Sequence, residues 1–430
     1  MAGDAPISHP KEWPVVRLGD IVLKIGSGAT PLGGSENYLA ERLRFALIRS
    51  QNVFDRRFES SGLAFISDEQ AKGLDNVLIQ PDDLLLNITG DGITFSRCCR
   101  VPSDVLPACV NQHVSIIRVN QEIADPGYVL GFLTHPAVKT YIESFNAGGS
   151  RRAITKGHIE SFRLPLPPRE EQSVIAQILG ALDDKLELNR RMNEALEAMA
   201  RAIFKSWFVD FDPVRAKAEG RDRGLPKPLA DLFPDSLDDS EFGKMPATWQ
   251  IKALGDLIDL VYGKALKEEH RQPGPVAVYG SNGQVGWHNE KLACGPGIIV
   301  GRKGNPGVVT WAPTNFFAID TTFYVVPKTE CSSLYFLFYA LKDHCLASLG
   351  ADSAVPGLNR NMAYMSKQLV PSPPVLHAFD LHVRPLFDRI QKSNEQSRSL
   401  AGLRDTLLPK LVSGELRVTE AHRFVEAQTR

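Results

Sequence analysis

The chain lacks the sequence features of a membrane, secreted or metal-binding protein. Its longest apolar run, near residues 334–341, is much shorter than the ~20 residues that span a bilayer. Its N-terminal residues contain no apolar segment of the kind found in a secretory signal. Its six cysteines, at positions 98, 99, 109, 294, 331 and 345, match neither the spacing of a metal site nor that of a disulfide framework. We therefore expect a cytoplasmic protein with reduced cysteines and no bound metal.

Motifs of the common enzyme classes are also missing. The sequence has no P-loop, no His-Glu-x-x-His zinc motif and no Gly-x-Ser-x-Gly nucleophile motif. Gly26 and Gly28 begin like a nucleotide-binding loop, but Pro31 stands close to where a phosphate-binding helix would start. The net charge of -1 argues against a protein that binds DNA without sequence preference. These absences predict a protein that is not an enzyme and binds no cofactor of its own.

The sequence does contain an internal repeat, and the most regular part of this repeat is a heptad pattern. Apolar residues recur at alternating steps of four and three, the spacing of a coiled-coil seam, in two segments 204 residues apart. Two polar residues interrupt both copies at the same place. Each half of the chain is therefore predicted to end in a long helix that packs along another helix. The predicted pairing residues are Leu182, Leu186, Asn189, Asn193, Leu196, Ile203, Leu386, Ile390, Ser393, Ser397, Leu400 and Leu407.

The repeat extends beyond these helices. Trp13 and Trp249 each precede a predicted strand and a Leu-Gly-Asp turn into a short helix. Each half continues with mixed strands and loops, and prolines precede each long helix. We predict an α+β fold with a first globular domain at 1–168, a long helix at 169–209, a connector at 210–246, a second globular domain at 247–374, a second long helix at 375–413 and a tail at 414–430.

The long helices are predicted to pair with each other. Because each follows its own globular domain, an antiparallel coiled coil with pseudo-twofold symmetry would place one domain at each end. A seam over residues 175–207 spans roughly 50 Å at ~1.5 Å per residue. The connector between the halves is rich in proline and acidic residues and is predicted to be irregular.

Polar, basic and glycine-rich loops follow the predicted strands of both globular domains. Their side chains are of the types that contact base edges and phosphates, and glycine lets backbone N–H groups approach a phosphate closely. The alternative, that these loops are ordinary surface turns, stays open on composition alone. The predicted DNA-contacting residues are Ser27, Thr30, Tyr38, Arg49, Gln51, Asn52, Thr89, Thr94, Asn111, Gln112, His113, Ser150, Arg151 and Arg152 in the first domain, and Ser281, Asn282, Arg302, Lys303, Thr321, Ser353, Asn359 and Arg360 in the second.

Taken in order, these segments resemble the specificity subunits of type I restriction-modification enzymes. The resemblance covers nearly the whole chain, roughly residues 13–418. Besides the two Leu-Gly-Asp openings, it rests on Gly26-Ser-Gly-Ala-Thr-Pro, Leu164-Pro-Leu-Pro-Pro-Arg-Glu-Glu-Gln, Phe204-Lys-Ser-Trp-Phe-Val-Asp-Phe-Asp-Pro-Val, Val278-Tyr-Gly-Ser-Asn-Gly-Gln-Val-Gly, Ile298-Ile-Val-Gly-Arg-Lys-Gly and Leu408-Pro-Lys-Leu-Val-Ser-Gly-Glu-Leu.

The resemblance implies two target-recognition domains, each recognising one half of a split double-stranded DNA site, and two helices that space them. It implies partners that carry out the chemistry: two adenine methyltransferase (modification) subunits that use S-adenosylmethionine, and restriction/translocase subunits that use ATP and Mg. The sequence departs from the expected pattern at Pro385, which is predicted to delay or kink the second long helix. The two globular segments also align poorly, as expected of domains that recognise different sequences.

Two other classes of function remain open from the sequence. One is a methyltransferase–nuclease enzyme with its own recognition domain, which a methylation assay on the isolated chain would reveal. The other is a coiled-coil adaptor without DNA binding, which would produce no gel shift on random-sequence DNA.

Overall fold

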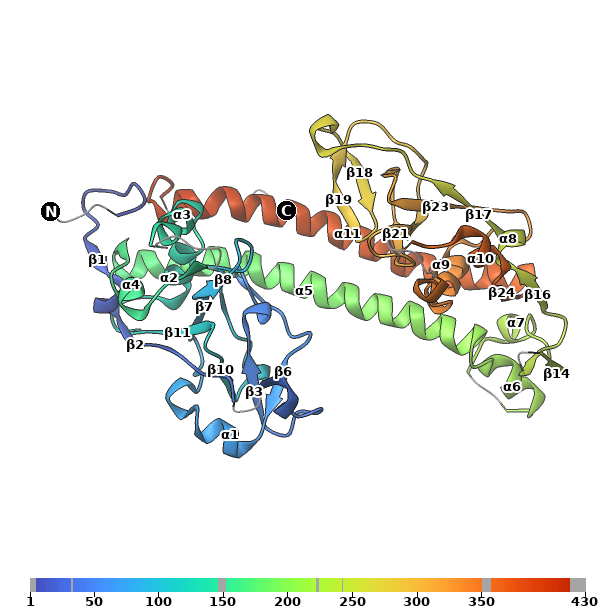
Figure 1. The fold of residues 1–430 in the computed structure, drawn as a ribbon, viewed down its shortest axis with the longest axis horizontal. Helices are drawn as coiled ribbons and strands as arrows, with labels where there is room; N and C mark the ends of the chain where they lie inside the picture. The colour runs from blue at the N-terminus through green and yellow to red at the C-terminus, as the bar shows by residue number, and fades with distance from the viewer. Residues whose placement is uncertain are drawn as a thin grey trace. The chain divides into compact units, whose positions relative to one another are not determined.

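The computed structural model describes residues 5–31, 34–145, 152–221, 224–241, 243–349 and 357–417. The chain forms two compact units, and the first is discontinuous in sequence. Unit 1 comprises Met1–Arg190 and Gln396–Arg430, whereas unit 2 comprises Arg191–Glu395. The chain therefore leaves unit 1 midway along one long helix and returns midway along the other (Figure 1).

Unit 1 is built on a four-stranded antiparallel sheet and a three-stranded sheet. The four-stranded sheet has the order β2 (Val22–Ser27), β11 (Val114–Val119), β7 (Leu84–Asn87) and β9 (Cys98–Arg100). The three-stranded sheet has the order β10 (Ala108–Val110), β3 (Phe45–Ile48) and β6 (Ala64–Ile66), with β10 and β3 parallel. All four residues of β7 are buried, the three leucines and the polar Asn87 alike.

Shorter elements complete unit 1. Strand β1 (Val15–Arg17) pairs antiparallel with β13 (Arg163–Pro165), and a 3-10 turn at Leu18–Ile21 follows β1. This confirms the predicted strand and Leu-Gly-Asp turn. The remaining elements are α1 (Asp68–Lys72), α2 (Pro126–Leu133), α3 (Pro136–Ser144), α4 (Lys156–Glu160), the pair β4 (Val53–Phe54) and β5 (Arg57–Phe58), and the pair β8 (Thr89–Gly90) and β12 (Arg152–Ala153).

Unit 2 repeats the sheet topology of unit 1. Its four-stranded sheet has the order β17 (Ile258–Tyr262), β23 (Thr322–Pro327), β20 (Gly297–Gly301) and β21 (Val309–Ala312). Its three-stranded sheet has the order β19 (Gly283–His288), β18 (Val276–Gly280) and β22 (Phe316–Ala318), with β18 and β22 parallel. Strand β16 (Gln250–Ala253) pairs with β24 (Lys367–Val370), and α8 (Leu254–Leu257) follows β16. The helices α9 (Leu334–Asp343) and α10 (Arg360–Met365) complete the unit.

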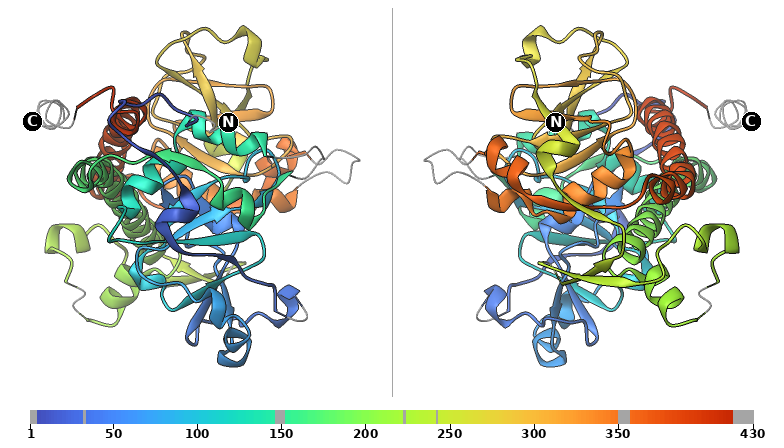
Figure 2. Two further views of the ribbon diagram at one scale, coloured as in Figure 1. Left: turned by 90° about the vertical axis from the view of Figure 1, so that its left-hand side faces the viewer. Right: turned by 90° about the vertical axis from the view of Figure 1, so that its right-hand side faces the viewer.

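The two long helices are α5 (Arg169–Phe208) and α11 (Pro373–Val412), each of 40 residues. Within each unit a part of α5 lies beside a part of α11 (Figure 1, Figure 2). In unit 1, Asn189 contacts Ser397 and Asp183 contacts Arg404. In unit 2, Asn193 contacts Asn394, and Phe204 contacts Phe379. Residue numbers rise along one helix as they fall along the other, so the pairing is antiparallel.

The structure differs from two predictions, the delayed start of the second long helix and the irregular connector. Helix α11 begins at Pro373 and continues through Pro385, so this proline does not delay the helix. The packing of buried Val383 and Phe387 on either side of Pro385 offsets the lost hydrogen bond. The connector is also more regular than predicted, since it contains α6 (Asp212–Ala218), α7 (Lys227–Ala230) and the hairpin of β14 (Leu237–Ser240) and β15 (Gly243–Pro246).

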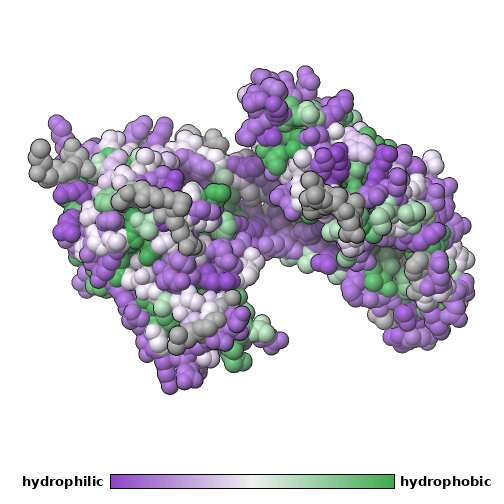
Figure 3. All heavy atoms as spheres, in the orientation of Figure 1, coloured by the Kyte–Doolittle hydropathy of each residue, from purple (hydrophilic) through white to green (hydrophobic). Residues whose placement is uncertain are grey.

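The described surface carries hydrophobic residues mainly in separate groups. On the face drawn in Figure 3, these groups lie among hydrophilic residues in both units. None of the helices in the described ranges combines the length and apolar character needed to cross a membrane.

Candidate nucleic-acid interface

In unit 1 the polar loops follow strands whose ends meet at one edge. Strands β2 and β7 both run antiparallel to β11, so β2 and β7 end on the same side of the sheet. The loops after β2 and β10 are joined by a hydrogen bond from the Gly28 N–H to the Asn111 carbonyl (3.2 Å). A side chain at Gly28 would collide with the Val110 carbonyl oxygen, at 1.7 Å from the position of its Cβ. This close approach explains why the second glycine of the Gly-Ser-Gly segment, Gly28, has no side chain.

Hydroxyl, amide and imidazole groups form a connected set at this edge. Thr30 Oγ1 donates a hydrogen bond to Gln112 Oε1. Thr89 Oγ1 lies 2.5 Å from His113 Nδ1, and the ring of His113 is half-buried. Gln112 is exposed, so its carboxamide can offer both a donor and an acceptor to solvent. Side chains of this kind can form hydrogen bonds to base edges.

Some of the predicted contact residues of unit 1 instead stabilise turns. Asn52 is fully buried, and its side chain donates to the carbonyls of Glu59 and Ser61. Asn111 is also buried, and its side-chain oxygen accepts a hydrogen bond from the His113 N–H. Both side chains are therefore used inside the fold, and we do not retain them as contacts.

The other predicted residues of unit 1 differ in what they can offer a ligand. The Arg49 guanidinium lies 5.6 Å from the centre of the Tyr38 ring, and Gln51 is exposed. Ser27 is exposed at the end of β2. Arg152 is paired with Glu143 at 2.6 Å. Ser150 and Arg151 lie outside the described residues.

Thr94 faces a carboxylate. Its N–H and its hydroxyl each donate a 2.8 Å hydrogen bond to Asp91 Oδ1. These bonds, the one from the backbone N–H first, lower the pKa of the Asp91 carboxyl. Asp91 is exposed and negatively charged at neutral pH, so this turn would repel a phosphate group.

In unit 2, two arginines share one tyrosine ring at the corresponding edge. The guanidinium carbons of Arg302 and Arg360 lie 5.0 Å and 5.1 Å from the centre of the Tyr262 ring. The ring packs on Phe323, whose centre lies 4.9 Å away, and 47% of Tyr262 is exposed. Among the residues that the structure describes, no carboxylate forms an ion pair with Arg302 or Arg360. Two unpaired guanidinium groups on one aromatic platform suit an anionic ligand.

Backbone hydrogen bonds hold this cluster in place. The N–H groups of Arg302 and Lys303 both donate to the Thr321 carbonyl, at 2.8 Å and 3.1 Å. The Leu358 N–H donates to the Arg302 carbonyl (2.9 Å), which joins the loop after β20 to the start of α10. Lys303 is exposed. Tyr262 is not among the predicted site residues, because a tyrosine at the end of a strand resembles an ordinary strand residue in the sequence.

The remaining predicted residues of unit 2 have smaller roles in the described structure. The Asn359 side chain caps α10 by accepting hydrogen bonds from the N–H groups of Asn361 and Met362. Asn282 accepts a hydrogen bond from Asn305. Ser281 and Thr321 are half-buried, and Ser353 lies outside the described residues.

The strand registers show which residues of the two units occupy matching positions. Ser27 pairs across from Ser115 in unit 1, and Tyr262 pairs across from Phe323 in unit 2, at the same place in the sheet. The Ile154 N–H donates to the Ile88 carbonyl as the Leu358 N–H donates to that of Arg302. Arg302 therefore corresponds to the apolar Ile88. One fold thus presents different side-chain chemistry at the same edge in each unit.

Comparisons with known proteins identify the family. A family model described as the type I restriction modification DNA specificity domain matches residues 10–198. The specificity subunit of the type I restriction enzyme HindI from Haemophilus influenzae is 26% identical, over 86% of this chain and 94% of its own length. That of MjaIX from Methanocaldococcus jannaschii is 24% identical, over 96% and 95%. The chain belongs to the family of type I restriction-modification specificity subunits.

A solved structure supports the fold of this specificity subunit. The crystal structure of the S subunit of a type I restriction-modification system from M. genitalium has a TM-score of 0.57 at 16% sequence identity, covering 95% of this chain and 99% of that one. Two β-rich domains, each followed by a long helix that pairs with the other, confirm the predicted fold class.

The specificity subunit is the non-catalytic component that determines DNA target recognition in a type I system. Within the described part of the chain, no group of three or more His, Cys, Asp or Glu residues could hold a metal ion. The buried thiols of Cys98 and Cys109 have raised pKa values because burial disfavours the thiolate, to about 12 and about 11 respectively. Neither thiol is therefore suited to act as a nucleophile at neutral pH.

The structure places the predicted helix-pairing residues along α5 and α11 with different degrees of burial. Leu182, Asn189, Ser393 and Leu407 are buried. Half-buried positions are Leu186, Asn193, Leu196, Ile203, Leu386, Ile390, Ser397 and Leu400. Asn189 donates hydrogen bonds to Gln396 Oε1 (3.0 Å) and Ser397 Oγ (3.1 Å), and Asn193 donates to Asn394 Oδ1 (2.7 Å). The polar interruption of the heptads thus forms hydrogen bonds from one helix to the other.

Proposed function

We propose that each domain of this specificity subunit recognises one half of a bipartite double-stranded DNA site. The observation that carries the proposal is the matching edge of the two sheets, where one topology presents unlike side chains. Unit 1 offers Ser27, Thr89 and His113, whereas unit 2 offers Tyr262, Arg302 and Arg360. Direct recognition of different base sequences requires such differences on a common scaffold.

The proposed role of the paired helices is to set the gap between the half-sites. Each of the two helices has 40 residues, which corresponds to a helix length of about 60 Å at ~1.5 Å per residue. The polar contacts of Asn189 and Asn193 support this role, because a polar seam position fixes register at a cost in stability.

The proposed partners carry out the chemistry of the system. We infer that two adenine methyltransferase subunits dock on the helices and use S-adenosylmethionine, and that restriction/translocase subunits use ATP and Mg. The near-zero net charge supports this division of labour, since a chain of charge -1 has little nonspecific attraction for DNA and gains affinity from its partners.

A domain replacement tests the proposal. Residues 13–160 are replaced by the corresponding segment of another specificity subunit, and the target of the assembled methyltransferase complex is determined. We expect one half-site to change while the other half-site and the gap stay the same. Changes in both half-sites would contradict the proposal, because the two domains would then not act separately.

A further inference from the structure

A cluster of charges connects the first domain to both long helices. Arg56 lies in the tight turn between β4 and β5, with a left-handed backbone (φ 59°). Contacts with β9 and α3 hold this turn in place. The Arg56 N–H donates to the Cys98 carbonyl (2.8 Å), and Asp55 accepts from the Cys98 N–H (3.0 Å) and from Lys139 Nζ (2.5 Å). The backbone that carries Arg56 is therefore well fixed.

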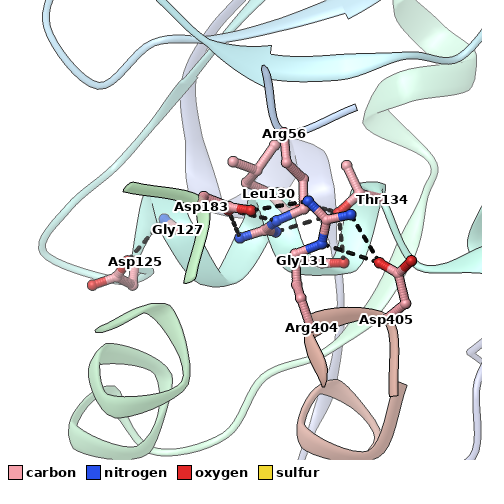
Figure 4. A network of polar contacts seen from close by, with 9 residues as sticks. All are labelled: Arg56, Asp125, Gly127, Leu130, Gly131, Thr134, Asp183, Arg404 and Asp405. Carbon is pink, nitrogen blue, oxygen red and sulfur yellow. Dashed lines mark hydrogen bonds and ion pairs between the residues drawn. The ribbon is translucent and has the colours of Figure 1, made fainter. Parts of the chain in front are cut away.

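The Arg56 side chain reaches out of the domain to Asp183 on α5 (Figure 4). Its Nε and Nη2 lie 2.8 Å and 2.7 Å from Asp183 Oδ2. The other carboxylate oxygen of Asp183 accepts from Nη1 of Arg404 on α11 at 3.2 Å. Arg404 also pairs with Asp405 at 2.8 Å. We call Arg56, Asp183 and Arg404 the junction cluster.

The junction cluster is mostly shielded from water. The exposed fractions of the three side chains are 4% for Arg56, 16% for Asp183 and 21% for Arg404. Buried charges of this kind have to keep their partners, and a guanidinium–carboxylate pair has a strict geometry. The cluster therefore restrains the orientation of the domain on the helices more strongly than an apolar contact of the same area would.

The same β4–β5 hairpin connects the junction cluster to the candidate DNA-contacting loop. Arg49 and Gln51 lie just before β4, and Arg56 lies at the turn just after it. The two ends of the hairpin are tied together beside Gln51, where the Glu59 N–H donates to the Asn52 carbonyl (2.8 Å). Only a few residues separate Arg56 from Arg49 and Gln51. A change in the position of Arg56 would therefore displace the loop that carries these two residues.

Unit 2 has no equivalent charges at the matching helix positions. Adding 204 to Asp183 gives Phe387, and subtracting 204 from Arg404 gives Ala200. Phe387 packs against Trp311 and Tyr335, with ring centres 4.8 Å and 5.0 Å apart. Each domain shares an apolar core with its helices, and at these matching positions unit 1 adds an ionic cluster where unit 2 has aromatic packing.

We propose that the junction cluster is a positioning device that fixes the first domain on the helix pair and so sets which gap between half-sites the subunit accepts. This inference rests on the proposed bipartite recognition. Each base pair added to the gap moves the next half-site by ~3.4 Å and rotates it by about 35°. A domain held in one orientation cannot follow this displacement without distorting the DNA or itself.

The test measures gap tolerance with the full-length chain assembled with its methyltransferase partner. Binding is compared on duplexes that carry the native gap or a gap one base pair shorter or longer. The wild type is expected to prefer the native gap by about tenfold or more. Arg56→Ala should reduce this preference to about threefold or less, and Arg56→Lys, which keeps the charge but not the two-pronged geometry, should be intermediate.

Arg118→Ala is the matched control. Arg118 forms a comparable pair with the buried Asp83 (2.7 Å), but both residues belong to the domain itself. This variant should lower the melting temperature and leave the gap preference unchanged. If Arg56→Ala does not fold, Arg404→Gln removes the contact to α11 instead and should also relax the preference.

Two outcomes overturn the inference at different levels. If the wild type discriminates between gaps and the folded Arg56 and Arg404 variants discriminate equally well, the positioning role is wrong and bipartite recognition stands. If the wild-type complex binds no bipartite site, the proposed function fails, and this inference fails with it.

Discussion

At the scale of single residues, the arginines of unit 2 are the side chains best placed to hold an anion. Arg302 and Arg360 both lie close to the Tyr262 ring without a described acidic partner, whereas Arg152 of unit 1 is neutralised by Glu143. A free guanidinium can contact guanine through two hydrogen bonds, while a lysine more often holds phosphate as a point charge. The neighbours Arg302 and Lys303 should therefore contribute differently.

Substituting these two residues separately tests that difference. Arg302→Ala should cost about 1–3 kcal/mol on the cognate site and relax one position of the second half-site. Lys303→Ala should weaken binding to all sequences alike and reduce the salt slope by about one. Both effects can be measured by titrating DNA at several salt concentrations. If both variants bind DNA normally but fail to assemble with the methyltransferase, this loop belongs to a protein interface instead.

Tyr262 should act through its ring. Tyr262→Leu removes the platform under both guanidinium groups and should weaken cognate binding by about 1 kcal/mol, with the salt slope unchanged because no charge is lost. Tyr262→Phe keeps the ring and should bind like the wild type. Affinities on cognate DNA and on DNA with a scrambled second half-site provide the measurement. Equal losses in the two variants would mean that the hydroxyl matters and the ring does not.

Residue types alone predicted where the polar loops would be and could not tell which side chains face solvent. Asn52 and Asn111 have the right chemistry for base contacts, but the turns that they stabilise bury them. The sequence did not indicate a role for Tyr262. This role depends on Arg360, which is almost one hundred positions away in the sequence and lies beside Tyr262 only in the fold. Such long-range contacts are not encoded in local patterns.

At the scale of the elements, the central feature is the polar interruption in the paired helices. The heptads predicted both helices, because an apolar stripe must be buried against another surface. Their antiparallel pairing was predicted from the position of each helix after its own globular domain. Pro385 was harder to interpret from sequence. Tertiary packing around it, through Val383 and Phe387, outweighs the local preference of proline.

Replacing the polar seam residues should separate stability from register. Asn189→Leu with Asn193→Leu should stabilise the helix pair by about 1–3 kcal/mol, because buried amides give way to apolar contact. Register should become less defined, since the hydrogen bonds to Ser397 and Asn394 are lost. Urea unfolding reports the first effect, and distances between spin labels on the two helices report the second. Lys185→Leu, on the exposed side of α5, is the control. A destabilised double variant with a single sharp distance would contradict this account.

At the scale of the whole molecule, helix length should determine gap length. Removing one heptad from the middle of each helix keeps the seam in phase and shortens the spacer by about 10 Å, close to three base pairs. Recognition of the same half-sites with a gap about three base pairs shorter is expected, as measured by selection from DNA pools with varied gaps. Altered half-site sequences would mean that the helices do more than set the spacing.

The common topology of the two domains is only partly visible in the sequence. Their sequences align poorly, yet the order and direction of the strands in the main sheets are the same. Sheets tolerate many substitutions as long as alternate or buried positions stay apolar, whereas the loops at the strand ends are free to diverge. The helices kept a recognisable repeat because a heptad restricts every third or fourth residue.

The most direct test of two-domain recognition is a map of methylated adenines in DNA from cells that express this chain with its methyltransferase. The account predicts one bipartite motif, with two short defined half-sites separated by a nonspecific gap of fixed length, that disappears when this chain is absent. A single contiguous motif, or half-sites at variable spacing, would contradict it.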